Sequence, residues 1–250
     1  MKIDLNGINI LVTGASRGIG AGIATALGKA GGRVAVHYHR NDKLADDIVR
    51  DIGNGSMSFC ANLEDAKACD QLFHSVLDAF GHLDVLVNNA GIFLMTPLDS
   101  KAWLQHWDKT LDVNLRAAGL LSRLAILHFR DRGRGRIINI SSRAAFRGDH
   151  AEHLAYAASK AGMVALTKSI ARAFGKDNIT SFLIAPGWVR TDMNKETIEQ
   201  FGEESITKDL ALNKLTEPED LAPLTVLLAS GMADHATGTT IDINAGSYVH

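Results

Sequence analysis

The chain of 250 residues contains little cysteine, little proline and few aromatic side chains. Its two cysteines, Cys60 and Cys69, make a poor disulfide framework for a chain of this size, so the sequence predicts a reducing compartment. Four prolines and 23 glycines are too few for a fibrous or low-complexity chain. Aromatic residues make up 6% and the formal net charge is −2, which argues against a base-stacking surface and against a basic footprint for nucleic acid.

Long hydrophobic runs are also missing. The longest candidate, residues 224–233, stops well short of the roughly 18 apolar residues that a membrane-spanning helix needs. The first seven residues include an acid and a glycine where a signal peptide has an apolar run. We therefore expect a soluble, cytoplasmic protein with neither nucleic acid nor membrane as a partner.

Short β-rich runs alternate with longer helical patterns along the chain. The composition, 46% hydrophobic and 22% charged, is that of a globular protein, and the length alone leaves one or two domains open. Strands are predicted at residues 8–13, 33–38, 56–61, 83–87, 136–140, 179–184 and 239–243. Helices are predicted at residues 19–29, 42–51, 66–80, 103–129 (in one piece or two), 156–174 and 218–230. Thr216 is the predicted cap of the last helix, with Glu219 three residues later.

This alternation predicts an α/β fold, because strands joined by helices form βαβ units with right-handed crossovers. The expected architecture is a Rossmann-like, doubly wound parallel sheet of seven strands with helices on both faces. No Pro/Ser-rich linker, charge block or internal repeat divides the sequence. Residues 1–250 are therefore expected to form a single domain.

A glycine cluster follows the first predicted strand and opens the first predicted helix. Glycines occupy the first, fifth and seventh places of the segment Gly14-Ala15-Ser16-Arg17-Gly18-Ile19-Gly20. A helix that begins there offers free N–H groups to an anion, and the missing side chains let a pyrophosphate approach. The cluster indicates a nucleotide site, although a purely structural turn would use the same residues.

A second motif, Asn88-Asn89-Ala90-Gly91, stands at the carboxyl end of the fourth predicted strand. Ligands of open α/β sheets bind outside those ends. Asparagine and glycine are also ordinary turn residues, so this motif alone decides nothing.

The third motif is Tyr156-Ala157-Ala158-Ser159-Lys160. Residues four apart lie on one face of a helix, so the ammonium of Lys160 is expected beside the phenol of Tyr156. An adjacent cation favours the phenolate, which would make the pair a general acid usable near neutral pH. The alternative is an ordinary surface pair of tyrosine and lysine.

Taken together, these motifs resemble the short-chain dehydrogenase/reductase (SDR) family. The resemblance covers essentially the whole chain, in order: residues 13–20, residues 88–91, Asn114, Ile140-Ser141-Ser142, Tyr156 with Lys160, and Pro186-Gly187-Trp188-Val189-Arg190-Thr191. A joint match of separated motifs is far more specific than any one motif. The resemblance implies a ketone–alcohol oxidoreductase that uses a nicotinamide cofactor.

The resemblance also implies a role for each catalytic residue. Tyr156 would give a proton to the substrate carbonyl oxygen, and Ser142 would hold that oxygen by a hydrogen bond. Lys160 would lower the pKa of Tyr156 and bind the cofactor ribose, and Asn114 would hold a water that relays protons to Lys160. Ser142 is chosen over its neighbour Ser141 by alignment from Ile140, although the spacing from Ser142 to Tyr156 is one residue longer than the family's commonest one.

For the cofactor, the resemblance places Tyr38 at the end of the second strand, where an acid would select NAD. No carboxylate is available at that position, and Arg17 and Arg40 could pair with a 2′-phosphate, so NADP(H) is favoured while NAD(H) remains possible. Arg40 could equally be a solvated loop residue. The third strand is followed by Asn62 and Leu63, where family members usually carry an aspartate that binds adenine. The implied cofactor-binding residues are Gly14, Ser16, Arg17, Gly18, Ile19, Gly20, Tyr38, Arg40, Asn62, Leu63, Asn89, Ala90, Gly91, Tyr156, Lys160, Pro186, Gly187, Val189 and Thr191.

The substrate is expected to be an acyl thioester or another small molecule. The sequence is most like the 3-oxoacyl-acyl carrier protein reductases, and residues 190–212 look like a mobile lid over the substrate. A sugar or polyol dehydrogenase of the same family, with NAD as its cofactor, is the nearer alternative, and a non-catalytic nucleotide-binding regulator is the more distant one. The family implies a homotetramer, with residues 101–132 and 156–176 forming one interface and the C-terminus another.

Two further patterns carry no expected function. His150 and His153 have a spacing found among metal ligands, but the sequence offers no convincing third ligand, so no metal is expected. Arginines at 130, 132, 134 and 136 cluster at a helix end, where cations complement the helix dipole. Docking of an acidic carrier protein is the alternative for this cluster.

Overall fold

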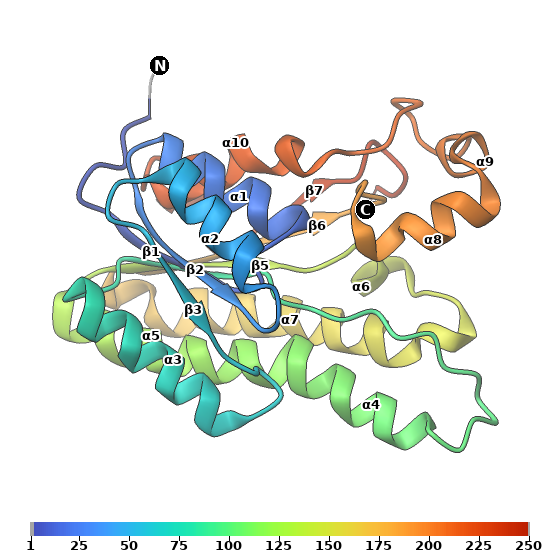
Figure 1. The fold of residues 1–250 in the computed structure, drawn as a ribbon, viewed down its shortest axis with the longest axis horizontal. Helices are drawn as coiled ribbons and strands as arrows, with labels where there is room; N and C mark the ends of the chain where they lie inside the picture. Colours follow the sequence, from blue (N-terminus) through green and yellow to red (C-terminus); the bar gives the residue numbers. More distant parts are fainter. Residues whose placement is uncertain (1–2, 250) are drawn as a thin grey trace.

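The computed structural model describes residues 3–249, with the side chains of residues 196, 197, 200 and 201 excepted. A parallel sheet of seven strands, in the order β3-β2-β1-β4-β5-β6-β7, forms its centre (Figure 1). The strands are β1 (Asn9–Val12), β2 (Arg33–Tyr38), β3 (Met57–Cys60), β4 (Val85–Asn88), β5 (Gly135–Ile140), β6 (Ile179–Pro186) and β7 (Thr240–Ile243). The predicted doubly wound, single-domain α/β fold is confirmed.

Helices cover both faces of the sheet. One layer consists of α1 (Gly18–Lys29), α2 (Asp42–Ile52) and α10 (Pro218–Ala229); the other consists of α3 (Ala66–Phe80), α5 (Ala117–Arg132) and α7 (Leu154–Phe174). Four further helices are α4 (Trp103–Leu111), α6 (Ala144–Arg147), α8 (Asp192–Phe201) and α9 (Glu203–Thr207). Among the described residues, no helix has both the length and the apolar character that crossing a bilayer requires.

The pleat of the strands divides the core into two halves. In β1, Ile10 and Val12 belong to the cluster that also contains residues of α1 and α10, whereas Leu11 belongs to the cluster that contains residues of α3 and α5. Successive strand residues point to opposite faces, so an uninterrupted apolar strand supplies both clusters. Such strands hold the loops at their carboxyl ends in fixed positions.

The long helix predicted over residues 103–129 is two helices joined by a π-helical turn. Asp112–Arg116 forms this turn between α4 and α5, and the fully buried Asn114 lies within it. Single π-helical turns inside helices are frequent at functional sites.

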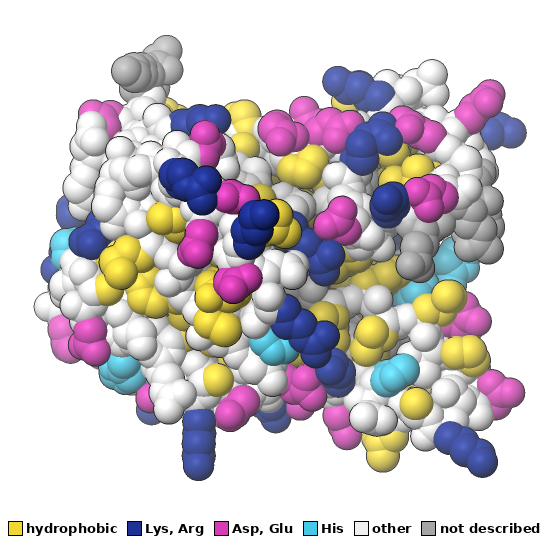
Figure 2. Space-filling view, in the orientation of Figure 1, with side chains coloured by type: hydrophobic (Ala, Val, Ile, Leu, Met, Phe, Trp, Pro, Cys, Tyr) yellow, Lys and Arg dark blue, Asp and Glu magenta, His cyan; other side chains and the backbone are white. Residues whose placement is uncertain are grey.

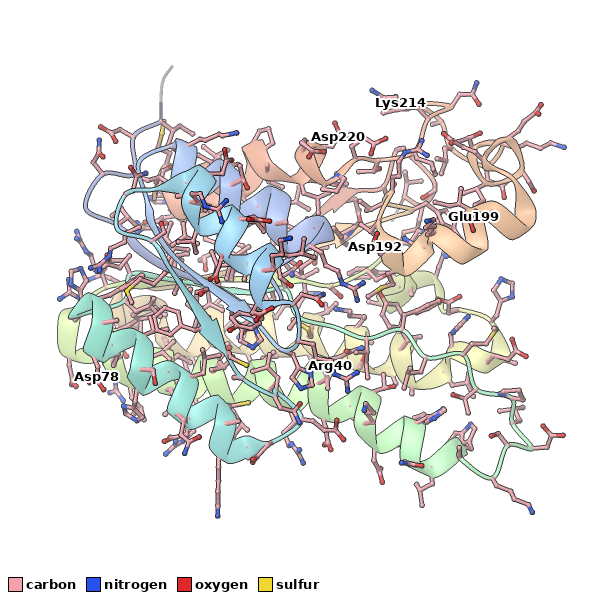
Figure 3. The ribbon with its side chains drawn as sticks, viewed as in Figure 1. Arg40, Asp78, Asp192, Glu199, Lys214 and Asp220 are labelled. Atoms are coloured by element: carbon pink, nitrogen blue, oxygen red, sulfur yellow. The ribbon has the colours of Figure 1, made fainter. Side chains whose placement is uncertain are left out.

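The predicted cap of α10 is wrong by one residue. The N-cap is Glu217, and it forms a capping box with Asp220 (Figure 3). Thr216 cannot serve because its backbone N–H and carbonyl already bond Trp188 and Arg190 in a short bridge beside Val189.

Candidate active site

The glycine turn lies between β1 and α1 and closes tightly on itself. Gly14 has φ of +61°, which favours glycine, and a Cβ there would lie 2.9 Å from the Cα of Ala90. A Cβ on Gly20 would clash with the carbonyl oxygen of Gly14 and would lie 2.5 Å from Nδ2 of Asn89. Only a chain without side chains at these positions can make this turn.

The amino end of α1 has the properties of an anion site. Its first turn contains no acidic residue, and no side chain caps it. Ser16, Gly18 and Ile19 are partly buried at this opening, and Arg17 is exposed beside it. The free N–H groups and the helix dipole favour a phosphate there.

Asn89 links the glycine turn to the carboxyl end of β4. Its Nδ2 donates to the carbonyl oxygens of Thr13 (2.8 Å) and Gly14 (3.0 Å). The backbone N–H groups of Asn89 and Ala90 both donate to Oγ1 of Thr13. The first two motifs found in the sequence therefore form one hydrogen-bonded unit.

His37 belongs to the same unit, although the sequence analysis placed it only within a strand. It is 2% exposed, its Nδ1 accepts from the N–H of Gly14 (2.9 Å), and its Nε2 lies 3.1 Å from the carbonyl oxygen of Ala61. These partners require the neutral tautomer with the proton on Nε2. Burial lowers the pKa of His37 to about 4, which keeps it in this form at neutral pH. The one signal in the sequence is a polar residue inside the apolar run of β2.

The residues predicted to hold the adenosine half lie at the carboxyl ends of β2 and β3. Tyr38 is partly buried, and Arg40 is exposed in the loop after β2 (Figure 3). Asn62 is exposed, and its Oδ1 accepts from the N–H of Glu64 (3.2 Å). The side chain of Leu63 lies in the core, so only its backbone can face a ligand.

Tyr156 and Ser142 form a hydrogen-bonded pair. Burial raises the pKa of Tyr156 to about 12. The hydrogen bond with Ser142 lowers this pKa, but by less than burial raises it. Ser141, in contrast, donates its hydroxyl to the backbone carbonyl of Lys160 (2.8 Å). Of the two adjacent serines, Ser142 is therefore the one that meets the phenol.

Lys160 lies below the ring of Tyr156, as expected for residues four apart on α7. Its Nζ is 5.8 Å from the ring centroid and donates to the carbonyl oxygen of Ile140 (3.0 Å). Burial lowers the pKa of Lys160 to about 8. The expectation of a lowered phenol pKa does not hold in the structure, because removal from water dominates the titration of both groups.

Asn114 lies close to this pair and holds the chain that follows β4. Its Oδ1 accepts from the N–H of Ile92 (2.8 Å), and its Nδ2 donates to the carbonyl of Ile92 and to Oγ of Ser159. A Cβ on Gly91 would lie 3.4 Å from Nζ of Lys160 and 3.5 Å from Oδ1 of Asn114. Gly91 thus keeps space open above both polar groups.

The segment after β6 runs along the opposite side of the crevice. Pro186 ends the strand, and Gly187 continues the sheet by donating its N–H to Ile243. Val189 is 2% exposed, and Thr191 is the N-cap of α8 and adjoins the glycine turn at Gly18. The four residues that the resemblance implies for cofactor binding here, Pro186, Gly187, Val189 and Thr191, thus follow the carboxyl end of β6.

The segment predicted to be a lid, residues 190–212, is largely helical. α8 and α9 cover a small apolar cluster formed by Ile206, Leu210 and Leu215 with Trp188. Arg190 pairs with Glu203 (2.6 Å) and Glu217 (2.9 Å), and these side chains are about half exposed. Asp192, at the start of α8, pairs with Arg17 at 3.4 Å (Figure 3).

In the described part of the chain, no group of three His, Cys, Asp or Glu residues is arranged to hold a metal ion. His153 instead stacks on Phe93 with ring centroids 4.0 Å apart, and Phe93 meets Tyr156 edge to face at 4.7 Å. Of the clustered arginines, Arg130, Arg132 and Arg136 pair with Asp177, Asp84 and Asp234. These contacts support structural roles for His153 and for the three paired arginines.

The predicted cofactor-binding and catalytic residues lie at the carboxyl edge of the sheet. A phosphate suits the tight glycine turn and the uncapped helix end, and the backbone of Gly91 lies next to Lys160, which is stacked below the ring of Tyr156. The site would therefore join an anion-binding end to a proton-donating end across the carboxyl edge of the sheet.

Comparison with known proteins agrees with this geometry. The family model described as enoyl-(acyl carrier protein) reductase matches residues 14–248. The chain is 37% identical to the 3-oxoacyl-[acyl-carrier-protein] reductase FabG of Staphylococcus aureus over 242 residues, covering 96% of this chain and 97% of the relative. It is 36% identical to the 3beta-hydroxysteroid dehydrogenase 1 of Eggerthella lenta over 252 residues, covering 98% and 95%.

Solved structures give the same result. A structure from Beutenbergia cavernae, described as an NAD(P)-dependent gluconate 5-dehydrogenase with bound NADP, superposes with a TM-score of 0.91 at 32% identity, covering 99% of each chain. A dehydrogenase/reductase from Sinorhizobium meliloti gives a TM-score of 0.89 at 34% identity, covering 99% and 98%. The chain therefore belongs to the short-chain dehydrogenase/reductase family and is an NAD(P)-dependent oxidoreductase that interconverts a ketone and a secondary alcohol.

Proposed function

We propose that the protein is an NADP(H)-linked reductase of a 3-oxoacyl group. The observation that carries this proposal is the partly buried phenol of Tyr156, which is hydrogen-bonded to Ser142 with the ammonium of Lys160 below its ring. This is a proton donor, an orienting hydroxyl and a cation within one turn of helix and one strand end. The proposal includes Asn114, which supports the backbone beside Lys160.

The nicotinamide supplies the hydride when it is bound. Tyr156 gives its phenolic proton to the substrate oxygen, and Ser142 holds that oxygen by a hydrogen bond. The raised pKa of Tyr156 keeps the phenol protonated at neutral pH, which suits reduction. Lys160, charged at neutral pH, stabilises the phenolate that remains and reaches the open space at Gly91, where the ribose would lie.

The choice of NADP(H) rests on charge at the adenosine end. No carboxylate ends β2, where Tyr38, His39 and Arg40 follow one another. The guanidinium groups of Arg17 and Arg40 suit a 2′-phosphate. The proposed remaining contacts come from Gly14, Ser16, Gly18, Ile19, Gly20, Asn62, Leu63, Asn89, Ala90, Gly91, Pro186, Gly187, Val189 and Thr191.

The 3-oxoacyl group is taken from the curated relatives, which are described as 3-oxoacyl-[acyl-carrier-protein] reductases. A dehydrogenase of sugar acids is the second candidate. It is favoured by the structural likeness to a gluconate 5-dehydrogenase and by a buried arginine next to Ser142. Residues 190–212 are proposed as the lid that closes over either substrate.

We also propose that the chain forms a cytoplasmic homotetramer. An apolar groove of about 400 Å³ runs between α5 and α7 and is lined by residues such as Leu127, Leu166 and Phe174. Leu127 is 48% exposed, and the occupant that fits is the same pair of helices from a second copy. Light scattering that gives the mass of one chain would refute this assembly.

The function is tested by following NADPH and NADH oxidation with an acetoacetyl thioester, a crotonyl thioester and a panel of ketones. We expect turnover of the acetoacetyl compound with NADPH in preference to NADH. Turnover of the crotonyl thioester instead would mean that the protein reduces a carbon–carbon double bond. No turnover of any carbonyl compound or alcohol, in either direction, would contradict the proposal.

A further inference from the structure

A second cation lies next to the reaction centre and has no part in the mechanism above. Arg143 follows Ser142 directly and begins α6. It is only 8% exposed, and burial lowers its pKa to about 10. Within the described residues, no hydrogen bond or ion pair joins its guanidinium to another side chain or to a carbonyl group.

The surroundings of Arg143 place its guanidinium between α6 and the lid. Its Cζ is 5.7 Å from the ring of Trp188, which lies between β6 and α8. The charges that act on it are Arg147, which disfavours the cation, and Asp149 and Asp209, which favour it. Figure 1 shows α6 between α7 and the lid helices, and Figure 2 shows the molecule hollowed on this side.

A guanidinium removed from water without a paired anion is unfavourable for folding. The other buried or half-buried arginines described here have partners: Arg136 is paired with Asp234, and Arg132 with Asp84. Arg143 faces two carboxylates at longer range but pairs with neither of them. Its side chain instead lies beside Trp188 and within the field of Asp209, in the region that the lid covers.

We infer that Arg143 binds a carboxylate of the substrate itself, so that the protein acts on oxo acids and hydroxy acids. This inference rests on the proposed ketone–alcohol oxidoreductase function, and it favours a free acid, as in the second candidate above, over the 3-oxoacyl thioester. Arg143 follows Ser142 directly in the chain, and its guanidinium lies beside Trp188 near the lid, so it is available to a substrate group that reaches beyond the carbonyl held by Ser142. The planar guanidinium matches a carboxylate with two parallel N–H donors. A thioester has no negative charge at this distance from its keto group.

The test compares charged substrates with neutral counterparts of similar shape. Acetoacetate is paired with methyl acetoacetate for reduction, and gluconate is paired with glucitol for oxidation. We expect the wild-type protein to favour the acid in at least one pair. R143Q should lower kcat/KM for that acid by about 10- to 100-fold, the usual loss when a charged hydrogen bond is removed. For the neutral counterpart we expect less than about a threefold change, because R143Q removes no contact to it.

Two further variants separate charge recognition from structure. R143K keeps the charge without the paired donors and should restore part of the preference for the acid. R147Q removes an exposed arginine of the same helix and should leave the preference unchanged. A wild-type preference for the neutral member of both pairs, or an acid preference that persists in R143Q, would overturn the inference.

Binding measured without turnover distinguishes this inference from the proposed function. Calorimetric titration of Y156F with acetoacetate in the presence of NADPH, and with gluconate in the presence of NADP+, needs no catalysis. Binding that is lost in the Y156F/R143Q double variant supports the carboxylate site even if no ketone is reduced. If neither acid binds, the inference fails, whether or not neutral ketones are turned over. If R143Q folds poorly, the inference is still tested by the preference for the acid over its neutral counterpart, measured as kcat/KM in the wild type and in R143K.

Discussion

The cofactor end and the lid end of the crevice are held together in different ways. At the cofactor end, Gly14 is fixed by two partly buried hydrogen bonds: its N–H donates to Nδ1 of His37, and its carbonyl oxygen accepts from Nδ2 of Asn89. At the lid end, Arg190 and Glu203 form ion pairs about half exposed to water, over one small apolar cluster. Buried hydrogen bonds to backbone groups are costly to break, whereas exposed ion pairs contribute little. The comparison indicates a fixed site for the cofactor beside a segment that can open for substrate.

We expect the largest loss of activity from a substitution of Tyr156, between the cofactor end and the lid end. Y156F removes the proton donor, and kcat for reduction should fall by about 10²- to 10⁴-fold. NADPH affinity, measured by fluorescence titration, should change little because the phenol contacts the reacting atoms. Unchanged activity together with intact cofactor binding would show that Tyr156 is not the proton donor.

The raised pKa of Tyr156 gives this residue a pH signature. Oxidation of an alcohol needs the phenolate, so its rate should keep rising with pH across the alkaline range towards the pKa of about 12. Reduction needs the protonated phenol and should stay level near neutral pH. A plateau of the oxidation rate at or below pH 7, measured as a profile of kcat, would mean that the bound cofactor lowers this pKa.

At the cofactor end, G20A should be the most damaging substitution. The added Cβ would clash with the carbonyl of Gly14 and crowd Asn89. We expect a loss of about 1–3 kcal/mol in stability, together with weaker NADPH binding. G175A is the matched control, because a Cβ at that exposed glycine meets nothing within 4 Å. Equal melting temperatures and equal NADPH affinities for the two variants would contradict the close packing of the turn.

H37F tests whether a buried hydrogen bond holds the glycine turn. It leaves the N–H of Gly14 without an acceptor, which should cost about 1–3 kcal/mol of unfolding free energy and weaken NADPH binding. H37N offers an amide oxygen in place of Nδ1 and should recover part of both losses. Identical behaviour of the phenylalanine and asparagine variants would mean that only side-chain volume matters.

The same residue should make stability depend on pH. The folded pKa of about 4 lies below the unfolded value of 6.5, so the unfolded chain binds a proton first as the pH falls. The stabilisation is complete above pH 6.5 and is lost between 6.5 and 4. Urea unfolding at pH 7 and pH 5 should therefore show a smaller difference between wild type and H37N at pH 5.

At the lid end, R190Q should have the smallest effect on stability. Its partners Glu203 and Glu217 are exposed, so the melting temperature should change by less than about 2 °C. The KM for the ketone should rise about two- to fivefold while NADPH affinity stays the same, because only the lid is loosened. A large drop in melting temperature would show that the lid is as firmly held as the cofactor end.

The sequence was most informative where function requires particular residue types. The glycines of the turn and the spacing of four between Tyr156 and Lys160 are local properties, and in the structure Lys160 lies below the ring of Tyr156, as that spacing predicts. His37 was missed because its partners, Gly14 and Ala61, are each more than twenty residues away. The cap of α10 was misplaced for a similar reason, since a distant strand end occupies Thr216.

The sequence by itself determined the order of strands and helices and the family, and it predicted the residues that bind the cofactor. Each of these depends on periodicity, glycine placement or short-range spacing, which the chain carries locally. The tertiary structure decided that the pKa of Tyr156 is raised rather than lowered, and that Asn114 lies within a π-helical turn. It also left Arg143 buried without an ion pair among the described residues. Those outcomes depend on burial and on which distant groups come into contact, and both arise only when the chain folds.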